Sequence, residues 1–183
     1  MKETADTRTR IQDVALELFT EQGYEATSLR EIAERLGVTK AALYYHFKTK
    51  EDIVTSMFES RVAVMDELIA WGQAQPKTPE TRREFVRRYA ADLQKGRHHQ
   101  TMRFFERNQT AMRDNPAGEK VRERMAAMLD ILTDKDAPLT DQLRSALAIF
   151  AMHATWFVFR QPEVTDEQRQ EAGLQVALEM IGD

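Results

Sequence analysis

The sequence predicts an all-α fold of about nine helices. Apolar residues recur at spacings of three and four over most of the 183 residues, which is the period of an amphipathic helix. No stretch alternates apolar and polar residues for long enough to predict a strand. Glycine, proline and short polar segments interrupt the helical pattern, so the connections between helices are expected to be short.

The first four helices are expected over residues 7–22, 28–36, 39–46 and 50–72. Ser28 can cap the second helix, with Glu31 three residues later completing a capping box. Gly37 stands where a left-handed residue ends a helix most easily. Thr39 can cap the third helix two residues later. Each boundary of this region therefore has its own local signal.

Five further helices are expected over residues 79–95, 97–113, 118–132, 139–160 and 165–181. Polar loops rich in proline, glycine and aspartate separate them. The helix over 139–160 differs from the others because it is apolar from Ala146 to Phe159, apart from His153 and Thr155. A helix that is apolar nearly all round must be covered on every side.

The second and third helices have the spacing of a helix-turn-helix, in which the second helix of the pair enters a DNA major groove. Leu43 and Phe47 lie four residues apart and predict the buried face of the helix over 39–46. The side chains left outward are those of Lys40, Ala41, Tyr44, Tyr45, His46 and Lys48. Two adjacent exposed tyrosines on so short a helix indicate a polynucleotide partner. The alternative is that the Tyr-Tyr-His group packs against the rest of the domain.

The charge of the amino-terminal region supports a local DNA-binding face. Residues 1–50 hold eight lysines and arginines against eight acids, yet the segment from Gly37 to Lys50 holds no acid. Such segregation matters more for binding a polyanion than the net charge of −4 of the whole chain. Arg8 and Arg10 are expected either to add phosphate contacts or to lie on an ordinary solvated helix start.

The segment from Arg10 to Val54 resembles the amino-terminal domain of TetR-family transcriptional regulators. The matching residues are Leu18, Phe19, Gly23, Tyr24, Thr27, Ser28, Ile32, Ala33, Gly37, Val38, Thr39, Lys40, Leu43, Tyr44, Tyr45, His46, Phe47 and Lys50. The resemblance implies a DNA-binding domain over residues 1–49 and a ligand-binding and dimerisation domain over residues 50–183. It further implies a homodimer that binds double-stranded operator DNA and usually releases it when a small molecule enters the second domain.

The resemblance also implies which side chains contact the DNA. These are Thr27, Ser28, Thr39, Lys40, Ala41, Tyr44, Tyr45, His46 and Lys50. Lys40 and Ala41 are expected at the groove floor, where lysine can donate to guanine and a small residue allows close approach. Tyr45, His46 and Lys50 are expected to hold phosphates and fix the register.

The last two helices are expected to form the dimer. The helices over 139–160 and 165–181 would pack with their copies as a four-helix bundle across a two-fold axis, which covers the apolar helix. The alternative is that the helix over 139–160 is the central core helix of a monomer.

Methionines and aromatic residues concentrate between residues 102 and 159, which suggests an apolar cavity for a hydrophobic effector. The candidate ligand-binding residues are Met102, Phe105, Gln109, Met112, Met128, Phe150, His153 and Trp156. For each of them an ordinary core role is the alternative, because aromatic residues at helical spacing usually pack in a core.

Other function classes are weakly supported. The chain has no cysteine, no HExxH, no Gly-rich phosphate loop and no nucleophile elbow, so we expect no enzyme, no metal site and no cofactor. No apolar run predicts a signal peptide or a membrane span, so a cytoplasmic protein is expected. Repression is the expected sense of regulation, with activation left open. A sensor of small molecules or proteins without operator function stays open as an alternative.

Overall fold

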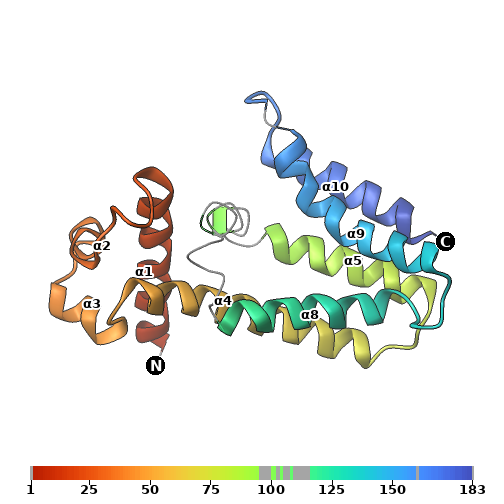
Figure 1. Ribbon diagram of the computed structural model, residues 1–183, viewed down its shortest axis with the longest axis horizontal. Coiled ribbons are helices and arrows are strands. Elements are labelled where there is room, and N and C mark those ends of the chain that lie inside the picture. The colour runs from red at the N-terminus through yellow and green to blue at the C-terminus, as the bar shows by residue number, and fades with distance from the viewer. Residues whose placement is uncertain are drawn as a thin grey trace. The chain divides into compact units, whose positions relative to one another are not determined.

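The computed structural model describes residues 2–94, 100–101, 104, 108, 116–159 and 161–182. Its helices are α1 (Lys2–Glu21), α2 (Leu29–Leu36), α3 (Lys40–His46), α4 (Lys50–Gln73), α5 (Pro79–Gln94), α8 (Pro116–Leu132), α9 (Leu139–Val158) and α10 (Asp166–Ile181) (Figure 1). These described ranges contain no strand, and the prediction of an all-α fold is confirmed. The helix expected over 97–113 lies for the most part outside the described residues.

The chain divides into two compact units. The first unit comprises residues 1–61 and 100–119, and the second comprises residues 62–99 and 120–183. This division differs from the domain boundary expected at residue 49, because the first turns of α4 pack within the first unit. There the amide of Gln12 on α1 donates to the hydroxyl of Ser56 on α4 at 2.7 Å.

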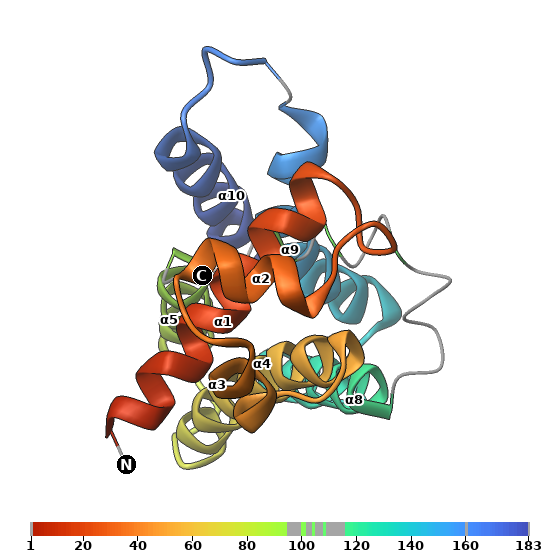
Figure 2. The same ribbon diagram turned by 90° about the vertical axis from the view of Figure 1, so that its left-hand side faces the viewer.

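The first unit is built on α1, α2 and α3, which Figure 2 shows together. The predicted capping box of α2 is confirmed, because Ser28 accepts from the backbone of Glu31 and Glu31 bonds the backbone of Ser28. Gly37 ends α2 with a φ of 74°, in the left-handed region that glycine adopts without strain. Thr39 caps α3 by accepting from the backbone of Ala42 at 3.1 Å. Local sequence signals therefore set both ends of the turn between α2 and α3.

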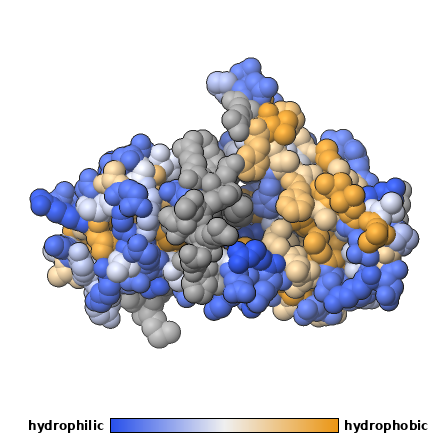
Figure 3. Space-filling view, in the orientation of Figure 1, coloured by the Kyte–Doolittle hydropathy of each residue, from blue (hydrophilic) through white to orange (hydrophobic). Residues whose placement is uncertain are grey.

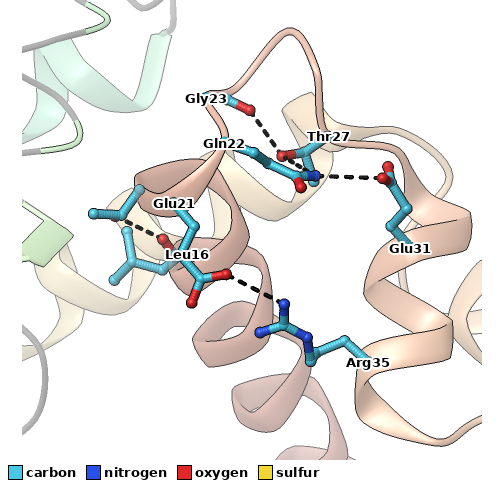
Figure 4. Close-up of polar contacts among 8 residues, drawn as sticks. Leu16, Glu21, Gln22, Gly23, Thr27, Glu31 and Arg35 are labelled. Atoms are coloured by element: carbon cyan, nitrogen blue, oxygen red, sulfur yellow. Dashed lines mark hydrogen bonds and ion pairs between the residues drawn. The ribbon is translucent and has the colours of Figure 1, made fainter.

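The turn between α1 and α2 is held by side-chain contacts (Figure 4). The hydroxyl of Thr27 donates to the carbonyl of Gly23 at 2.8 Å and accepts from the amide of Gln22 at 3.3 Å. An ion pair of 3.2 Å between Arg35 and Glu21 joins α2 to the end of α1. These contacts hold α2 against the end of α1.

The core of the second unit lies between the later part of α4 and helices α5, α8, α9 and α10. Phe85, Tyr89, Met128 and Ile149 are fully buried there. Helix α10 packs along α9 and also against α5. None of the helices in the described part of the chain combines the length and hydropathy that a bilayer crossing requires.

Gly173 allows α9 and α10 to approach closely. A Cβ atom at this position would lie 3.1 Å from the Cα of Met152 and 3.2 Å from the methyl of Thr155, and backbone atoms cannot yield as a flexible side chain can. We expect Gly173→Ala to lower the free energy of unfolding by about 1 kcal/mol, because overpacking outweighs the gain in helix propensity. Urea unfolding measures this effect, and an unchanged or raised stability would contradict the close packing.

Candidate nucleic-acid interface

The outward face of α3 is open to solvent and is held from behind by apolar packing. Leu43 and Phe47 are buried, as the spacing predicts. Lys40, Ala41 and Tyr45 are exposed, and the Tyr45 side chain has 76% of its surface accessible. This arrangement presents an exposed aromatic ring and an amine on a fixed helix. Tyr45 therefore does not pack against the rest of the domain, which was the alternative for the Tyr-Tyr-His group.

Neighbouring contacts give this face a cationic and aromatic character. The Lys40 amine lies 5.4 Å from the ring centre of Tyr44, and the ring of His46 meets that of Tyr45 edge-on at 5.2 Å. Arg8 of α1 lies over the ring of Phe47 at 4.4 Å. Tyr44 and His46 are half-buried. Amines and aromatic donors on a segment whose sequence holds no acid suit a phosphate backbone and base edges.

Two of the expected DNA-contacting residues are occupied by contacts within the protein. Thr27 is only 2% exposed, and its hydroxyl is used by the turn between α1 and α2, whereas Ser28 next to it is exposed at the start of α2. The Lys50 amine donates to the carbonyls of Tyr24 at 2.6 Å and Glu25 at 3.3 Å. The same amine lies 4.5 Å from the ring centre of Tyr24. Thr27 and Lys50 thus make contacts within the first unit, and the expectation that they contact DNA stays a prediction.

Because Lys50 joins the start of α4 to the turn before α2, its removal should loosen this part of the first unit. We expect Lys50→Ala to lower the stability of the DNA-free protein by about 1 kcal/mol, the usual net value of one such hydrogen bond. Faster hydrogen exchange over residues 23–31 would report the loss. The exposed Lys120 of the second unit is the matched control. Equal hydrogen exchange over residues 23–31 in Lys50→Ala and Lys120→Ala would show that the Lys50 amine does not hold this turn.

Glu51 was not singled out from the sequence and Tyr24 was named only among the residues of the family resemblance, and both extend this contact. The Tyr24 hydroxyl donates to the Glu51 carboxylate at 3.0 Å, and both burial and this bond raise the pKa of Tyr24. The Glu51 carboxyl has a lowered pKa, chiefly because its own backbone N–H and the Tyr24 hydroxyl donate to it. The adjacent charges of Lys50 and Glu51 directly after the aromatic segment are the only sequence signal that points to such a network.

The expected ligand-binding residues are dispersed. Met128 is fully buried in the core, whereas Phe150 is 58% exposed on α9. His153 is half-buried and its Nε2 lies 2.8 Å from the hydroxyl of Tyr89, while Trp156 lies 5.3 Å beneath the guanidinium of Arg169. The remaining candidates lie outside the described residues: Met102, Phe105, Gln109 and Met112.

Two pockets of about 210 and 320 Å³ are described in the second unit. Gly72, Lys77 and Ile131 contribute to the smaller one, and Asp134 and Arg144 to the larger. Neither pocket is lined by the candidate ligand residues that the structure describes.

Comparison with known proteins agrees with this geometry. Residues 11–57 match the family model of bacterial regulatory proteins of the tetR family. The transcriptional regulator AcrR of Shigella flexneri is 46% identical over 67 residues, which are 37% of this chain and 31% of that relative. The chain therefore matches about a third of the length of this relative.

Two solved structures share the fold over nearly the whole chain. AmtR of Mycobacterium smegmatis has a TM-score of 0.74 and 26% identity, covering 96% of this chain and 86% of its own. PfmR of Thermus thermophilus, a TetR-family transcriptional regulator, shares the fold with a TM-score of 0.65 and 24% identity, covering 94% of this chain and 97% of its own. AcrR and PfmR are named as regulators, in agreement with the expectation that this chain is not an enzyme. Residues 11–57 of the chain therefore match the tetR family of bacterial regulatory proteins, and nearly the whole chain shares the fold of AmtR and PfmR.

Proposed function

We propose that the protein is a transcriptional regulator that binds double-stranded operator DNA through α3. The observation that carries this proposal is the acid-free, solvent-exposed face of α3, with Lys40, Ala41 and Tyr45 outward on a helix whose other side is buried. Lys40 would donate to base edges or to a phosphate, and Ala41 would allow the helix to lie close to the groove floor. Ser28, Thr39, Tyr44 and His46 would add contacts to the phosphates beside the groove.

The operator would be a palindrome bound by a homodimer. Two copies of α3 spaced by one helical turn of DNA, about 34 Å, would reach consecutive major grooves on one side of the duplex. A two-fold axis would relate the two copies in such a complex. A surface on the second unit supports this arrangement.

We name this surface the apolar α9 face, and its members are Leu139, Leu143, Leu147, Phe150 and Val158 of α9 with Val176 of α10. Figure 3 shows apolar side chains gathered over α9 in the second unit. The α9 members recur at steps of three, four and eight residues and therefore lie along one side of the helix. Ala148, Ile149 and Met152 occupy the opposite, buried side. A large apolar face open to solvent is typical of an interface, and a second copy would cover it.

Release from DNA would follow binding of a hydrophobic small molecule in the second unit. The Tyr89–His153 hydrogen bond places a polar pair in an otherwise apolar core, where it could orient such a ligand. Met128, His153 and Trp156 stay candidates for this site together with Met102, Phe105, Gln109 and Met112. Phe150 is assigned to the apolar α9 face instead, because it is exposed there. The regulator would act in the cytoplasm as a repressor that occludes a promoter.

The test of operator binding is selection of duplexes from a randomised pool by the purified protein. We expect enrichment of one palindromic sequence with half-sites about one helical turn apart, and binding that weakens steeply with salt. A thermal-shift screen of apolar cations, flavonoids, acyl chains and antibiotics then tests the effector. A pool that stays random in low salt would contradict operator binding and favour a sensor without operator function.

A further inference from the structure

The first unit contains one aromatic side chain from far along the chain. Phe104 belongs by its contacts to this unit, although α5 and the rest of residues 62–99 precede it in the second unit. It is only 2% exposed. Its ring stacks on that of Phe19 with 5.2 Å between the centres, and the ring of Tyr24 lies 5.9 Å away. The carbonyl of Phe104 accepts from both the N–H of Asn108 at 3.1 Å and its side-chain amide at 2.8 Å.

This cluster continues directly into the contacts that hold the start of α4. Phe19 and Tyr24 meet edge-on at 5.0 Å, so the three rings form one group. The hydroxyl of Tyr24 bonds Glu51, and its carbonyl and ring hold the amine of Lys50. Lys50 and Glu51 are the first two residues of α4, and only three residues separate α4 from the end of α3. A displacement of the Tyr24 ring would therefore reach the base of α3 through a short run of contacts.

We propose that Phe104 is a positioning residue for the DNA-binding face, acting through Tyr24 on Lys50 and Glu51. This inference rests on the proposed function, because its readout is operator affinity. Phe104 is buried and is not among the side chains proposed to contact DNA. Its effect on binding would arise because the ring fixes Tyr24, and Tyr24 fixes the segment that follows α3. The first unit would then depend, for its DNA-binding geometry, on a residue outside the first sixty.

The experiment compares Phe104→Leu with two control variants in the same unit. Ile11 on α1 is fully buried, and Ile11→Val and Ile11→Ala bracket the loss of stability expected for the Phe104 variant. Leucine fills most of the space of the Phe104 ring, so Phe104→Leu should fold even if Phe104→Ala does not. The affinity of each variant is measured for the duplex that the wild type enriches, at a temperature where all variants are folded. We expect Phe104→Leu to bind roughly fivefold to tenfold more weakly than the Ile11 variant of equal stability.

A double-mutant cycle with Tyr24→Phe separates positioning from a merely structural role. Tyr24→Phe keeps the ring that Phe104 packs near and removes the hydroxyl that bonds Glu51. If Phe104 acts through Tyr24, the double variant should bind about as weakly as the weaker single variant, because both changes break the same run of contacts.

Two results would overturn the role of Phe104. One is operator affinity that follows stability alone, as in the Ile11 variants, and the other is additive effects of the two changes. A wild-type protein that enriches no duplex would instead remove the proposed function, and the positioning role with it.

Discussion

Replacement of Leu143 by aspartate should dissociate the proposed dimer into monomers. Leu143 is 59% exposed at the middle of the apolar α9 face, and in the proposed dimer it would be buried against the second copy. A carboxylate buried there without a partner costs several kcal/mol, and the two-fold axis introduces it twice. Since each 1.4 kcal/mol is tenfold in affinity, the dimer dissociation constant should rise by at least about a hundredfold.

Light scattering at micromolar concentration measures the change. The wild type should have twice the chain mass of 21.2 kDa and Leu143→Asp should have that mass once. Val64 of α4 is also an exposed apolar residue of the second unit but lies outside the apolar α9 face, so Val64→Asp is the matched control. Operator affinity should fall when the dimer dissociates, because a monomer binds only one half-site. A wild type of 21.2 kDa, or a dimeric Leu143→Asp variant, would show that this face does not join two copies.

The elements around the interface could be predicted from sequence because their signals are local. Ser28, Glu31 and Thr39 act on backbone groups only three residues away, and Gly37 acts on its own backbone angle. Such contacts depend little on the rest of the fold. The buried side of α3 was predictable for the same reason, since a spacing of four residues places Leu43 and Phe47 on one side of a helical segment.

The internal contacts of Thr27 and Lys50 could not be predicted in the same way. Their positions in the chain match those of DNA-contacting residues, but their partners depend on how α1 meets the start of α4. The Lys50 amine finds two carbonyls about twenty-five residues earlier in the chain. The place of Phe104 is harder still, because an apolar residue at helical spacing indicates burial without indicating which unit buries it.

The apolar face of α9 illustrates what composition can and cannot determine. The run from Ala146 to Phe159 predicts a helix that needs cover, and it does not tell which residues the chain itself covers. The structure separates them, since Ile149 and Met152 are buried within the second unit and Leu147 and Phe150 are exposed. Exposure of these side chains is why Leu143 is chosen for the aspartate substitution. Exposure is also why Phe150 is assigned to the apolar α9 face rather than to a ligand site.

Reversal of the charge at Lys40 should have the largest effect on operator binding of any single change in the first unit. Lys40 is exposed at the first position of α3, and no acid lies between Gly37 and Lys50. Lys40→Glu removes a donor and places a carboxylate against the DNA, once in each half-site of the proposed dimer. A single base contact contributes about 1–3 kcal/mol of discrimination, so the loss over two half-sites should be at least about thirtyfold in affinity. Because Lys40 is solvated and Thr39 caps α3 by accepting from the backbone of Ala42, the fold should be unchanged.

The salt dependence of Lys40→Ala distinguishes the two ways in which this amine could act. If each Lys40 holds a phosphate, the slope of log affinity against log salt should fall in magnitude by about 0.9 for each contact removed. If Lys40 donates to a guanine, the slope should stay nearly the same, and the preference for one base in each half-site should relax. Lys120→Glu changes the net charge equally on an exposed residue of the second unit and controls for long-range repulsion. Equal losses in Lys40→Glu and Lys120→Glu would mean that α3 does not enter the groove, because a contact with DNA has to be specific to its position.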